Sequence, residues 1–269
     1  MGELWKTIIL GIVEGLTEFV PISSTGHLLL CERWMSINLD EPFWKMFTVF
    51  IQIGAILAVV VYFRYRIVQL LSGSVSGNTV SQRLVMMVMV GTIPVLVVGY
   101  LFHKWVEKYM ERPVPIALAL LIGGLIMIAV EWARPGTRTR QIEHLTWGQA
   151  MGIGCAQVLA VLFPGTSRSA ATIIAGLVGG MSRQAAAEFS FLLAIPAMSA
   201  ASGYSLLKGA GGMSGQQIML LLVGTLVSFL VAWGVIAVFM EYIRKRTFTP
   251  FGVYRILLGV VVLVLLRRG

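Results

Sequence analysis

Six long apolar runs constrain this chain more than any other feature. Each approaches the roughly 20 residues that an α-helix needs to cross the hydrocarbon core of a bilayer. Hydrophobic residues make up 57% of the chain and charged ones only 12%, whereas soluble domains carry about 25% charged residues. We predict an all-α integral membrane protein with six transmembrane helices, at about 43–63, 84–102, 114–130, 187–207, 217–240 and 250–266.

The second half of the chain weakly repeats the first, in the same order along the sequence. At a shift of 143 residues, Gly11, Glu14, Pro21 and Ser24 fall on Gly154, Gln157, Pro164 and Ser167. A shift of 142 places residues 47–56 over 189–198, and a shift of 133 places 90–92 over 223–225. At a shift of 136, Gly123 falls on Gly259. Each half then holds one polar, proline-containing element and three spans. Because three is odd, the second copy must enter the membrane from the opposite side, so the repeats are inverted.

Inverted repeats with interrupted helices are known from transporters, where broken helices meet near the midplane and turn their ends toward a substrate. We therefore predict a single membrane domain over 1–269, with halves of about 1–133 and 134–269. The two polar elements are expected to form re-entrant helical hairpins at about 4–35 and 147–181.

The first polar element reads EGLTEFVPISSTGH over residues 14–27. On a helix, Glu14 and Glu18 would share one face, about 40° apart. Two ionised carboxylates at the membrane centre would cost roughly 5 to 7 kcal/mol, so they should face protein, water or a cation. The alternative is an interfacial helix with a solvated acidic face. Pro21 should break the helix, leaving Ser23, Ser24 and Thr25 to cap a second half-helix that begins near Gly26.

The second polar element, PGTSRSAAT at 164–172, repeats this design. Pro164 and Gly165 break the helix, and Thr166 and Ser167 can cap the next one. Free amides at such helix starts favour an anion such as phosphate. Arg168 adds a permanent cation whose fork matches phosphate oxygens, although it could instead form a structural bridge to one of the two glutamates.

His27 lies three residues after Ser24, close enough on a helical turn for covalent catalysis. His103 and His144 fall in polar connections and are expected at the surface. The acidic pair suits a hard divalent cation, Mg²⁺ or Ca²⁺ rather than zinc. Carboxylates, hydroxyls, backbone donors and an arginine form the set that phosphoryl chemistry uses. A site within the bilayer points to a phosphorylated or diphosphorylated lipid as substrate.

The net charge of +9 resides mostly in short connections between spans, which indicates topology and contact with anionic membrane lipids rather than a nucleic-acid partner. Counting Lys and Arg on the two sides only slightly favours an orientation in which the first full span runs inward.

At these residues the sequence resembles the undecaprenyl-diphosphate phosphatase family of the bacitracin-resistance type. EGLTEFVPISSTGH, FIQIGAILAVV at 50–60, GTIP at 91–94, PGTSRSAAT and EFSFLLAIP at 188–196 carry the resemblance. It implies a bacterial inner-membrane enzyme that converts undecaprenyl diphosphate to undecaprenyl phosphate, with a site open to the periplasm, dependence on Mg²⁺ or Ca²⁺, and a homodimer. The family's motifs fall on Glu14, Glu18, Ser23, Ser24, Thr25, His27, Ser167, Arg168, Ser169 and Thr172.

Our mechanistic hypothesis is that Ser24 attacks the terminal phosphorus while His27 accepts its proton, with the diphosphate bound by Arg168 and by the cation on the two glutamates. Direct attack by His27 is the competing route. Gln52 and Glu188 could line the cavity or merely bridge helices. A different class of function also fits the pattern: a transporter that flips a lipid phosphate through the same site.

Overall fold

The computed structural model describes residues 2–39, 41–103, 105, 112–133, 136–209 and 213–266. Across these ranges the chain forms helices and no extended strand. The helices are α1 (Leu4–Thr17), α2 (Ser24–Trp34), α3 (Pro42–Phe50), α4 (Gln52–Tyr62), α5 (Arg64–Val75), α6 (Thr79–Leu101), α8 (Pro113–Trp132), the 3₁₀ turn η1 (Ile142–His144), α9 (Trp147–Leu162), α10 (Arg168–Val178), α11 (Arg183–Gly209), α12 (Gly215–Lys245) and α13 (Thr249–Leu266).

Five helical segments in the described ranges are long and apolar enough to cross a membrane. They are α6, α8, α11, α12 and the continuous segment Pro42–Tyr62, which α3 and α4 form together around Ile51. Five of the six predicted spans are therefore present at that length. The sixth, at 250–266, corresponds to α13, which is apolar but belongs with the shorter helices.

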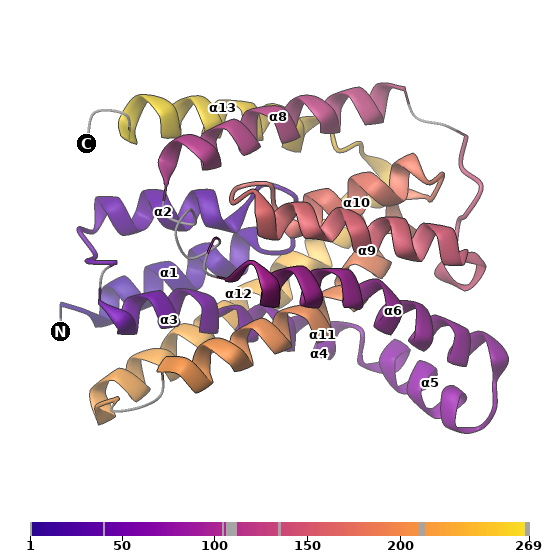
Figure 1. Ribbon diagram of the computed structural model, residues 1–269, viewed down its shortest axis with the longest axis horizontal. Coiled ribbons are helices and arrows are strands. Elements are labelled where there is room, and N and C mark those ends of the chain that lie inside the picture. The colour runs from indigo at the N-terminus through magenta and orange to yellow at the C-terminus, as the bar shows by residue number, and fades with distance from the viewer. Residues whose placement is uncertain are drawn as a thin grey trace.

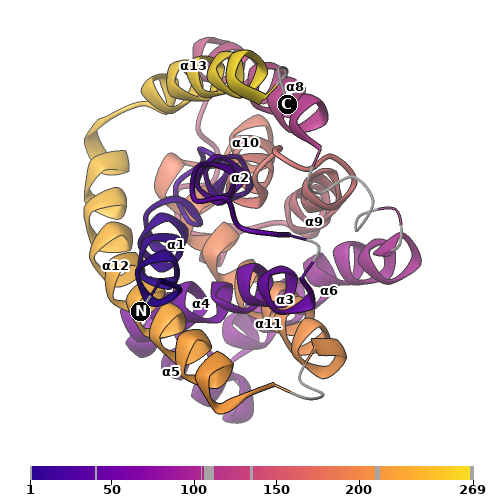
Figure 2. The same cartoon turned by 90° about the vertical axis from the view of Figure 1, so that its left-hand side faces the viewer.

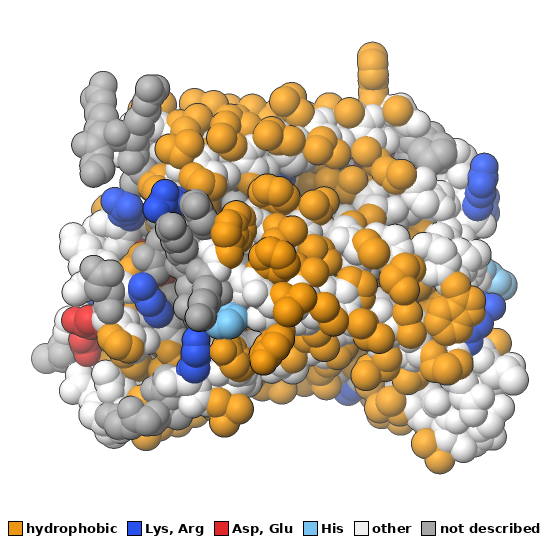
Figure 3. Space-filling model, in the orientation of Figure 1, with side chains coloured by type: hydrophobic (Ala, Val, Ile, Leu, Met, Phe, Trp, Pro, Cys, Tyr) orange, Lys and Arg blue, Asp and Glu red, His pale blue; other side chains and the backbone are white. Residues whose placement is uncertain are grey.

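The surface agrees with a multi-pass integral membrane protein. Apolar side chains cover the middle of the face seen in Figure 3, while Lys and Arg gather toward its left and right ends. Large apolar residues are also exposed along α6, α8, α12 and α13. Exposed apolar surface of this extent suits the hydrocarbon of a bilayer better than water, and the charged ends suit its two interfaces. The helices would therefore cross a bilayer along the horizontal axis of Figure 1.

Two helical hairpins occupy the centre of the molecule. The hairpin α1–α2 enters from the left of Figure 1, the hairpin α9–α10 enters from the right, and their turns meet in the middle. Seen along that axis, α2 and α10 lie inside a ring that includes α12, α13, α6 and α11 (Figure 2). The break in the first hairpin differs slightly from the prediction, because α2 begins at Ser24 with Ser23 as its N-cap and not near Gly26.

Glycines set the close contacts between the hairpins and the long helices. A Cβ on Gly11 of α1 would lie 2.7 Å from the carbonyl oxygen of Gly224 on α12, and one on Gly154 of α9 would lie 2.3 Å from that of Gly91 on α6. Small residues allow such backbone approach in membrane proteins. The helix α1 thus packs on a helix of the second half, and α9 packs on a helix of the first.

Candidate active site

The turns of both hairpins share one unusual backbone conformation. Ser23 and Ser167 have φ of 74° and 69°, a region that residues other than glycine rarely adopt. Each caps the helix that follows, because the Ser23 Oγ accepts a hydrogen bond from Gly26 N and the Ser167 Oγ accepts one from Ala170 N. The two half-helices therefore start with their free amides in the middle of the molecule, where an anion would be favoured.

Three predicted site residues converge between the turns. The Ser24 hydroxyl donates a hydrogen bond of 2.6 Å to Oε2 of Glu18, and Nη2 of Arg168 lies 3.4 Å from Oε1 of the same carboxylate. The side chains of Glu18 and Arg168 are only 8% and 11% exposed. A structural ion pair and a shared binding site both require this proximity, so the distance alone does not separate them.

Neighbours on α11 and in the first hairpin orient Arg168. Its Nη1 donates to the carbonyl oxygen of Ser190 at 3.2 Å, and its guanidinium carbon lies 5.2 Å from the centre of the Phe19 ring. Thr172 shares a 2.6 Å hydrogen bond with the Ser190 hydroxyl. The Ser169 hydroxyl bonds to carbonyl oxygens of the first hairpin. Ser169 thus joins the two hairpins, and Thr172 joins the first turn of α10 to α11.

Glu14 lies one helical turn before Glu18 and is fully buried. It interacts electrostatically with Glu18 and Arg168. Neither of its carboxylate oxygens receives a hydrogen bond from the residues the structure places. An acceptor pair buried this way would be satisfied by a cation. No group of three His, Cys, Asp or Glu side chains within the described ranges could hold a metal. The two glutamates would therefore need further oxygen ligands from a substrate or water, which Mg²⁺ sites commonly use.

Both ring nitrogens of His27 have hydrogen-bond partners other than the Ser24 hydroxyl. Its Nδ1 is 2.7 Å from the carbonyl oxygen of Ser23, and its Nε2 is 2.7 Å from the Tyr254 hydroxyl on α13, with the two rings stacked. Helical spacing does bring Ser24 and His27 onto one turn, but the imidazole turns toward α13. The proton acceptor that contacts Ser24 in this structure is Glu18.

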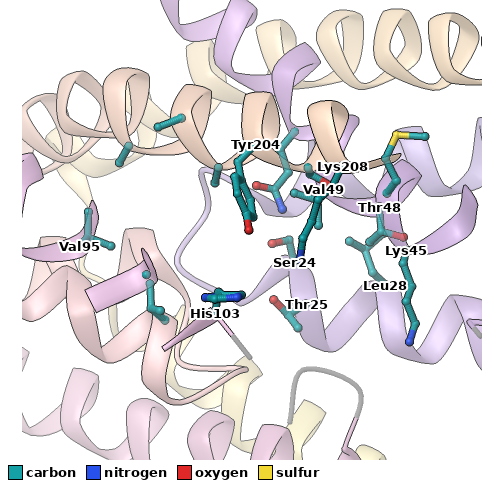
Figure 4. Close-up of a pocket in the computed structure, with 18 of the residues that line it drawn as sticks. Ser24, Thr25, Leu28, Lys45, Thr48, Val49, Val95, His103, Tyr204 and Lys208 are labelled. Atoms are coloured by element: carbon teal, nitrogen blue, oxygen red, sulfur yellow. The ribbon is translucent and has the colours of Figure 1, made fainter. Parts of the chain in front are cut away.

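Ser24 and Thr25 line a cavity of about 720 Å³. Its walls are mainly apolar and come from α2, α3, α4, α6 and α11. Tyr204 points from α11 toward the α2 side chains in Figure 4. Its ionisable lining residues are the basic Lys45, Lys208 and His103 and the acidic Glu32. An apolar space with hydroxyls and a mainly basic set of ionisable groups suits an amphiphile with an anionic head.

Gln52 and Glu188, whose roles the sequence left open, have different surroundings in the structure. Gln52 lines the cavity beside Thr48. Glu188 instead binds Arg66 of α5 at 3.1 Å, together with Glu143 of η1, and so bridges helices away from the cavity. His103, expected at the surface, lines the cavity too.

Arg255 and Tyr254 on α13 and Ser190 on α11 were not predicted from the sequence. Arg255 is fully buried and hydrogen-bonds the backbone of both hairpin turns. Its position within the apolar run 250–266 was a usable signal, because an ionisable residue inside a span is a functional candidate by default. The other two carry no comparable signal, since tyrosine and serine are common in membrane helices.

Comparison with known proteins covers nearly the whole chain. The family model described as bacitracin resistance protein BacA matches residues 7–261. An undecaprenyl-diphosphatase of Koribacter versatilis is 42% identical, with 98% of each chain covered. Another from Sorangium cellulosum is 44% identical over 96% of this chain and 85% of its own. A third, undecaprenyl-diphosphatase 2 of Rhodospirillum rubrum, is 44% identical over 99% and 96%.

Proposed function

The chain belongs to the bacitracin resistance protein BacA family, and from this premise we infer that it hydrolyses undecaprenyl diphosphate to undecaprenyl phosphate and orthophosphate. It is a phosphoric anhydride hydrolase that recycles the lipid carrier of cell-wall synthesis and confers bacitracin resistance. The observation that carries this function is the near full-length similarity to relatives named undecaprenyl-diphosphatase.

The site geometry supports phosphate chemistry on a lipid. A hydroxyl, a carboxylate and a guanidinium meet at Ser24, Glu18 and Arg168, and the hydroxyl also faces a largely apolar cavity. The cavity would take the first isoprenoid units, while the diphosphate would lie against the helix starts and Arg168. Ser23, Thr25, Gly165, Thr166, Ser167, Ser169 and Thr172 would bind or shape this phosphate site.

In the mechanism we favour, the Ser24 oxygen attacks the terminal phosphorus and its proton passes to Glu18. The bond from that phosphorus to the bridging oxygen breaks, and undecaprenyl phosphate leaves. Water then hydrolyses the phosphoserine and restores the serine. Assigning the proton to Glu18 follows the 2.6 Å hydrogen bond and revises the role first given to His27, which would instead hold the Ser23 turn through its carbonyl.

Attack by His27 remains the alternative covalent route. It would require the imidazole to release Tyr254 and turn toward the cavity. Rapid quenching with substrate labelled in the terminal phosphate, followed by peptide mapping, distinguishes the routes, since phosphoserine survives acid and phosphohistidine does not. We expect the label on Ser24. Label on His27 would transfer the nucleophile to the imidazole, and no adduct under any condition would count against both routes.

We propose that Glu14 and Glu18 hold a divalent cation, Mg²⁺ or Ca²⁺, against the diphosphate. Such an ion would neutralise the charge that develops on the phosphoryl oxygens. The bare carboxylate oxygens of Glu14 support this assignment.

We also propose that the fold is an inverted repeat with six spans and two re-entrant hairpins. The exchanged glycine contacts support it, because Gly11 meets Gly224 as Gly154 meets Gly91, and these are the pairs that shifts of 143 and 133 relate. The protein would lie in the bacterial inner membrane among its lipids, with the cavity toward the periplasm. A homodimer is proposed on the family resemblance, and light scattering in detergent would measure its mass.

The decisive experiment is release of orthophosphate by purified protein in detergent, given undecaprenyl diphosphate and Mg²⁺. We expect release by the wild type and a loss of about 100-fold or more in Glu18→Gln and Arg168→Ala, because general-base and charge-stabilising groups are each worth roughly that much. The exposed pair Glu241 and Arg244 on α12 supplies matched controls, E241Q and R244A, which should keep full activity.

The same assay separates an enzyme from a lipid-phosphate transporter, because a transporter would release no orthophosphate. The names of the relatives do not favour transport. Full turnover in folded E18Q and R168A would reject the site assignment while leaving the enzymatic function in place.

A further inference from the structure

Arg255 on α13 joins the turns of the two hairpins. Its side chain is fully buried, and within the described part of the chain its four hydrogen bonds all go to backbone carbonyl oxygens. The Pro21 carbonyl belongs to the first turn, at 3.4 Å, and the Gly165 and Thr166 carbonyls belong to the second, at 3.2 and 2.9 Å. The fourth acceptor, the carbonyl of Ala119 on α8, lies at 3.1 Å. A single guanidinium therefore spans both turns and the helix beside them.

The turns also contact each other directly, at distances similar to those of the Arg255 bonds. The Ser169 hydroxyl lies 3.3 Å and 3.2 Å from the carbonyl oxygens of Glu18 and Val20, and Arg168 lies 3.4 Å from the Glu18 carboxylate. Bonds of this length each constrain geometry only weakly, so the relative position of the turns depends on their number. Arg255 adds three bonds to the two turns and one to α8, and in this way it helps to fix the separation of Glu18 and Arg168.

Glycines on α8 and in the second turn leave room for this guanidinium. A Cβ on Gly123 of α8 would lie 2.4 Å from Nη2 of Arg255, the nitrogen that donates to three of the four carbonyls. Gly165 has a φ of 93°, and a Cβ there would lie 2.6 Å from the Ile116 carbonyl oxygen. Glycine at both positions permits the carbonyl groups and the guanidinium to meet.

Only an arginine can make this set of contacts. Its planar fork carries five donors in fixed directions, whereas a lysine ammonium is a compact point charge. Burial of a cation at membrane depth is costly, and among the placed residues the hydrogen-bond partners of Arg255 include no carboxylate to offset that burial. A merely apolar contact between α13 and α8 would be served better by leucine, so the arginine points to a need for fixed geometry.

We propose that Arg255 is a positioning residue that holds the two turns in the register at which Ser24, Glu18 and Arg168 converge on one phosphate. The inference rests on the proposed phosphatase activity, and Arg255 acts through the turns without touching the substrate. Displacing catalytic groups by about 1 Å can lower a rate by roughly 100-fold. Loss of the four-way contact should therefore reduce turnover in a protein that remains folded.

Two variants test this in the full-length protein in detergent. Arg255→Lys keeps the charge and removes the fork, and Gly123→Ala keeps the arginine and displaces its Nη2. For each we would measure kcat and KM per folded molecule, together with the melting temperature. We expect kcat to fall by about tenfold or more in R255K, with a smaller fall in G123A, and KM to stay within about threefold of the wild type.

Matched controls separate positioning from stability. A Cβ on Gly234 of α12 would meet nothing within 4 Å, so G234A should match the wild type. Arg183 on α11 binds Glu131, which also accepts a hydrogen bond from Phe248 N, so R183K should lower the melting temperature while kcat stays unchanged.

The outcomes are distinguishable. A wild type that releases no orthophosphate would defeat the proposed function itself. An active wild type with folded R255K and G123A at the wild-type kcat would overturn the positioning role and leave the function standing. If R255K does not fold, G123A decides alone, because it retains both the charge and the side chain.

Discussion

Glu14 and Glu18 lie one helical turn apart but have different surroundings. Glu18 is engaged by the Ser24 hydroxyl and by Arg168, whereas the oxygens of Glu14 meet no donor from the placed residues. A carboxylate with two partners is already balanced, and one with none requires a counter-charge or a proton when buried. Both glutamates are proposed to hold the cation, but Glu18 also accepts the hydrogen bond from the Ser24 hydroxyl. Glu14 would therefore serve cation binding alone, and Glu18 would serve both cation binding and proton transfer.

This division predicts different defects for the two substitutions. In Glu14→Gln, the Mg²⁺ concentration for half-maximal phosphate release should rise by at least about tenfold, since even outer-shell partners of a metal ligand are worth roughly 10- to 100-fold in affinity. Activity at saturating Mg²⁺ should recover further than in Glu18→Gln. A metal titration of both variants measures this, and an unchanged half-saturation in E14Q would remove Glu14 from the cation site.

Residue types and spacing were enough to select most of the candidate site. Glu18, Ser24 and Arg168 stand out because charged and hydroxyl groups are rare in an apolar chain, and the structure brings all three together. The direction of the His27 ring could not be predicted in the same way. It depends on Tyr254, which is 227 residues away, and helical spacing fixes a position on a turn but not the rotamer.

At the scale of the helices, apolar length, prolines, capping residues and glycines predicted helix ends and contacts with unequal accuracy. Apolar length located five of the six predicted spans, and the prolines located both breaks. Ser23, one of the three predicted cap candidates, is the N-cap of α2, but the helix begins two residues earlier than predicted. The sequence could not choose among three successive hydroxyl residues, because each is a good cap. Gly11 and Gly15 form a GxxxG pattern, which allows helices to approach closely, and both glycines pack against α12.

Glycine contacts between helices predict a sharp difference between two positions on α9. A Cβ on Gly154 would meet the Gly91 backbone at 2.3 Å, whereas one on Gly152 would meet nothing within 4 Å. Gly154→Ala should destabilise the protein by about 1–3 kcal/mol, because overpacking forces backbone shifts. Gly152→Ala should be neutral or slightly stabilising. Thermal unfolding in detergent compares them, and equal melting temperatures would show that α9 and α6 can separate freely.

The short helix α5 is attached through charges outside the spans. Arg66 binds Glu143 of η1 as well as Glu188. Partial burial would raise the pKa of Glu143, but the hydrogen bond and charge of Arg66 outweigh it and leave this pKa below its ordinary value. A carboxyl with a lowered pKa in the folded protein stabilises it above the unfolded pKa of about 4.3, and that contribution is lost as pH falls through the folded value.

We therefore expect the stability difference between wild type and Glu143→Gln to be full near pH 7 and to shrink as pH falls below about 4.3. Melting temperatures of both proteins across this range in one detergent supply the measurement. The exposed Glu241, paired with Arg244 at 56% and 60% exposure, provides a control, since E241Q should show little difference at any pH. A constant difference for E143Q would mean that the ion pair contributes nothing.

On the scale of the whole molecule, the two ends are chemically distinct. The cavity with Lys45, His103 and Lys208 lies toward the end where α11 stops and α12 begins. The cluster of Arg66, Glu143 and Glu188 lies at the other end, near α5 (Figure 1). The proposed orientation assigns the end with the cavity to the periplasm, where a diphosphate released outside the cell membrane could enter.

Cysteine labelling tests this orientation. Cys31 and Cys155 are free thiols and would first be replaced by alanine in a variant checked for phosphate release. Ser76, at the end of α5, and Gln216, in the first turn of α12, are both exposed. A membrane-impermeant maleimide applied to spheroplasts should label Gln216→Cys and spare Ser76→Cys, and lysis should expose both. The reverse pattern would turn the cavity toward the cytoplasm, and the substrate would then have to be drawn from the inner leaflet.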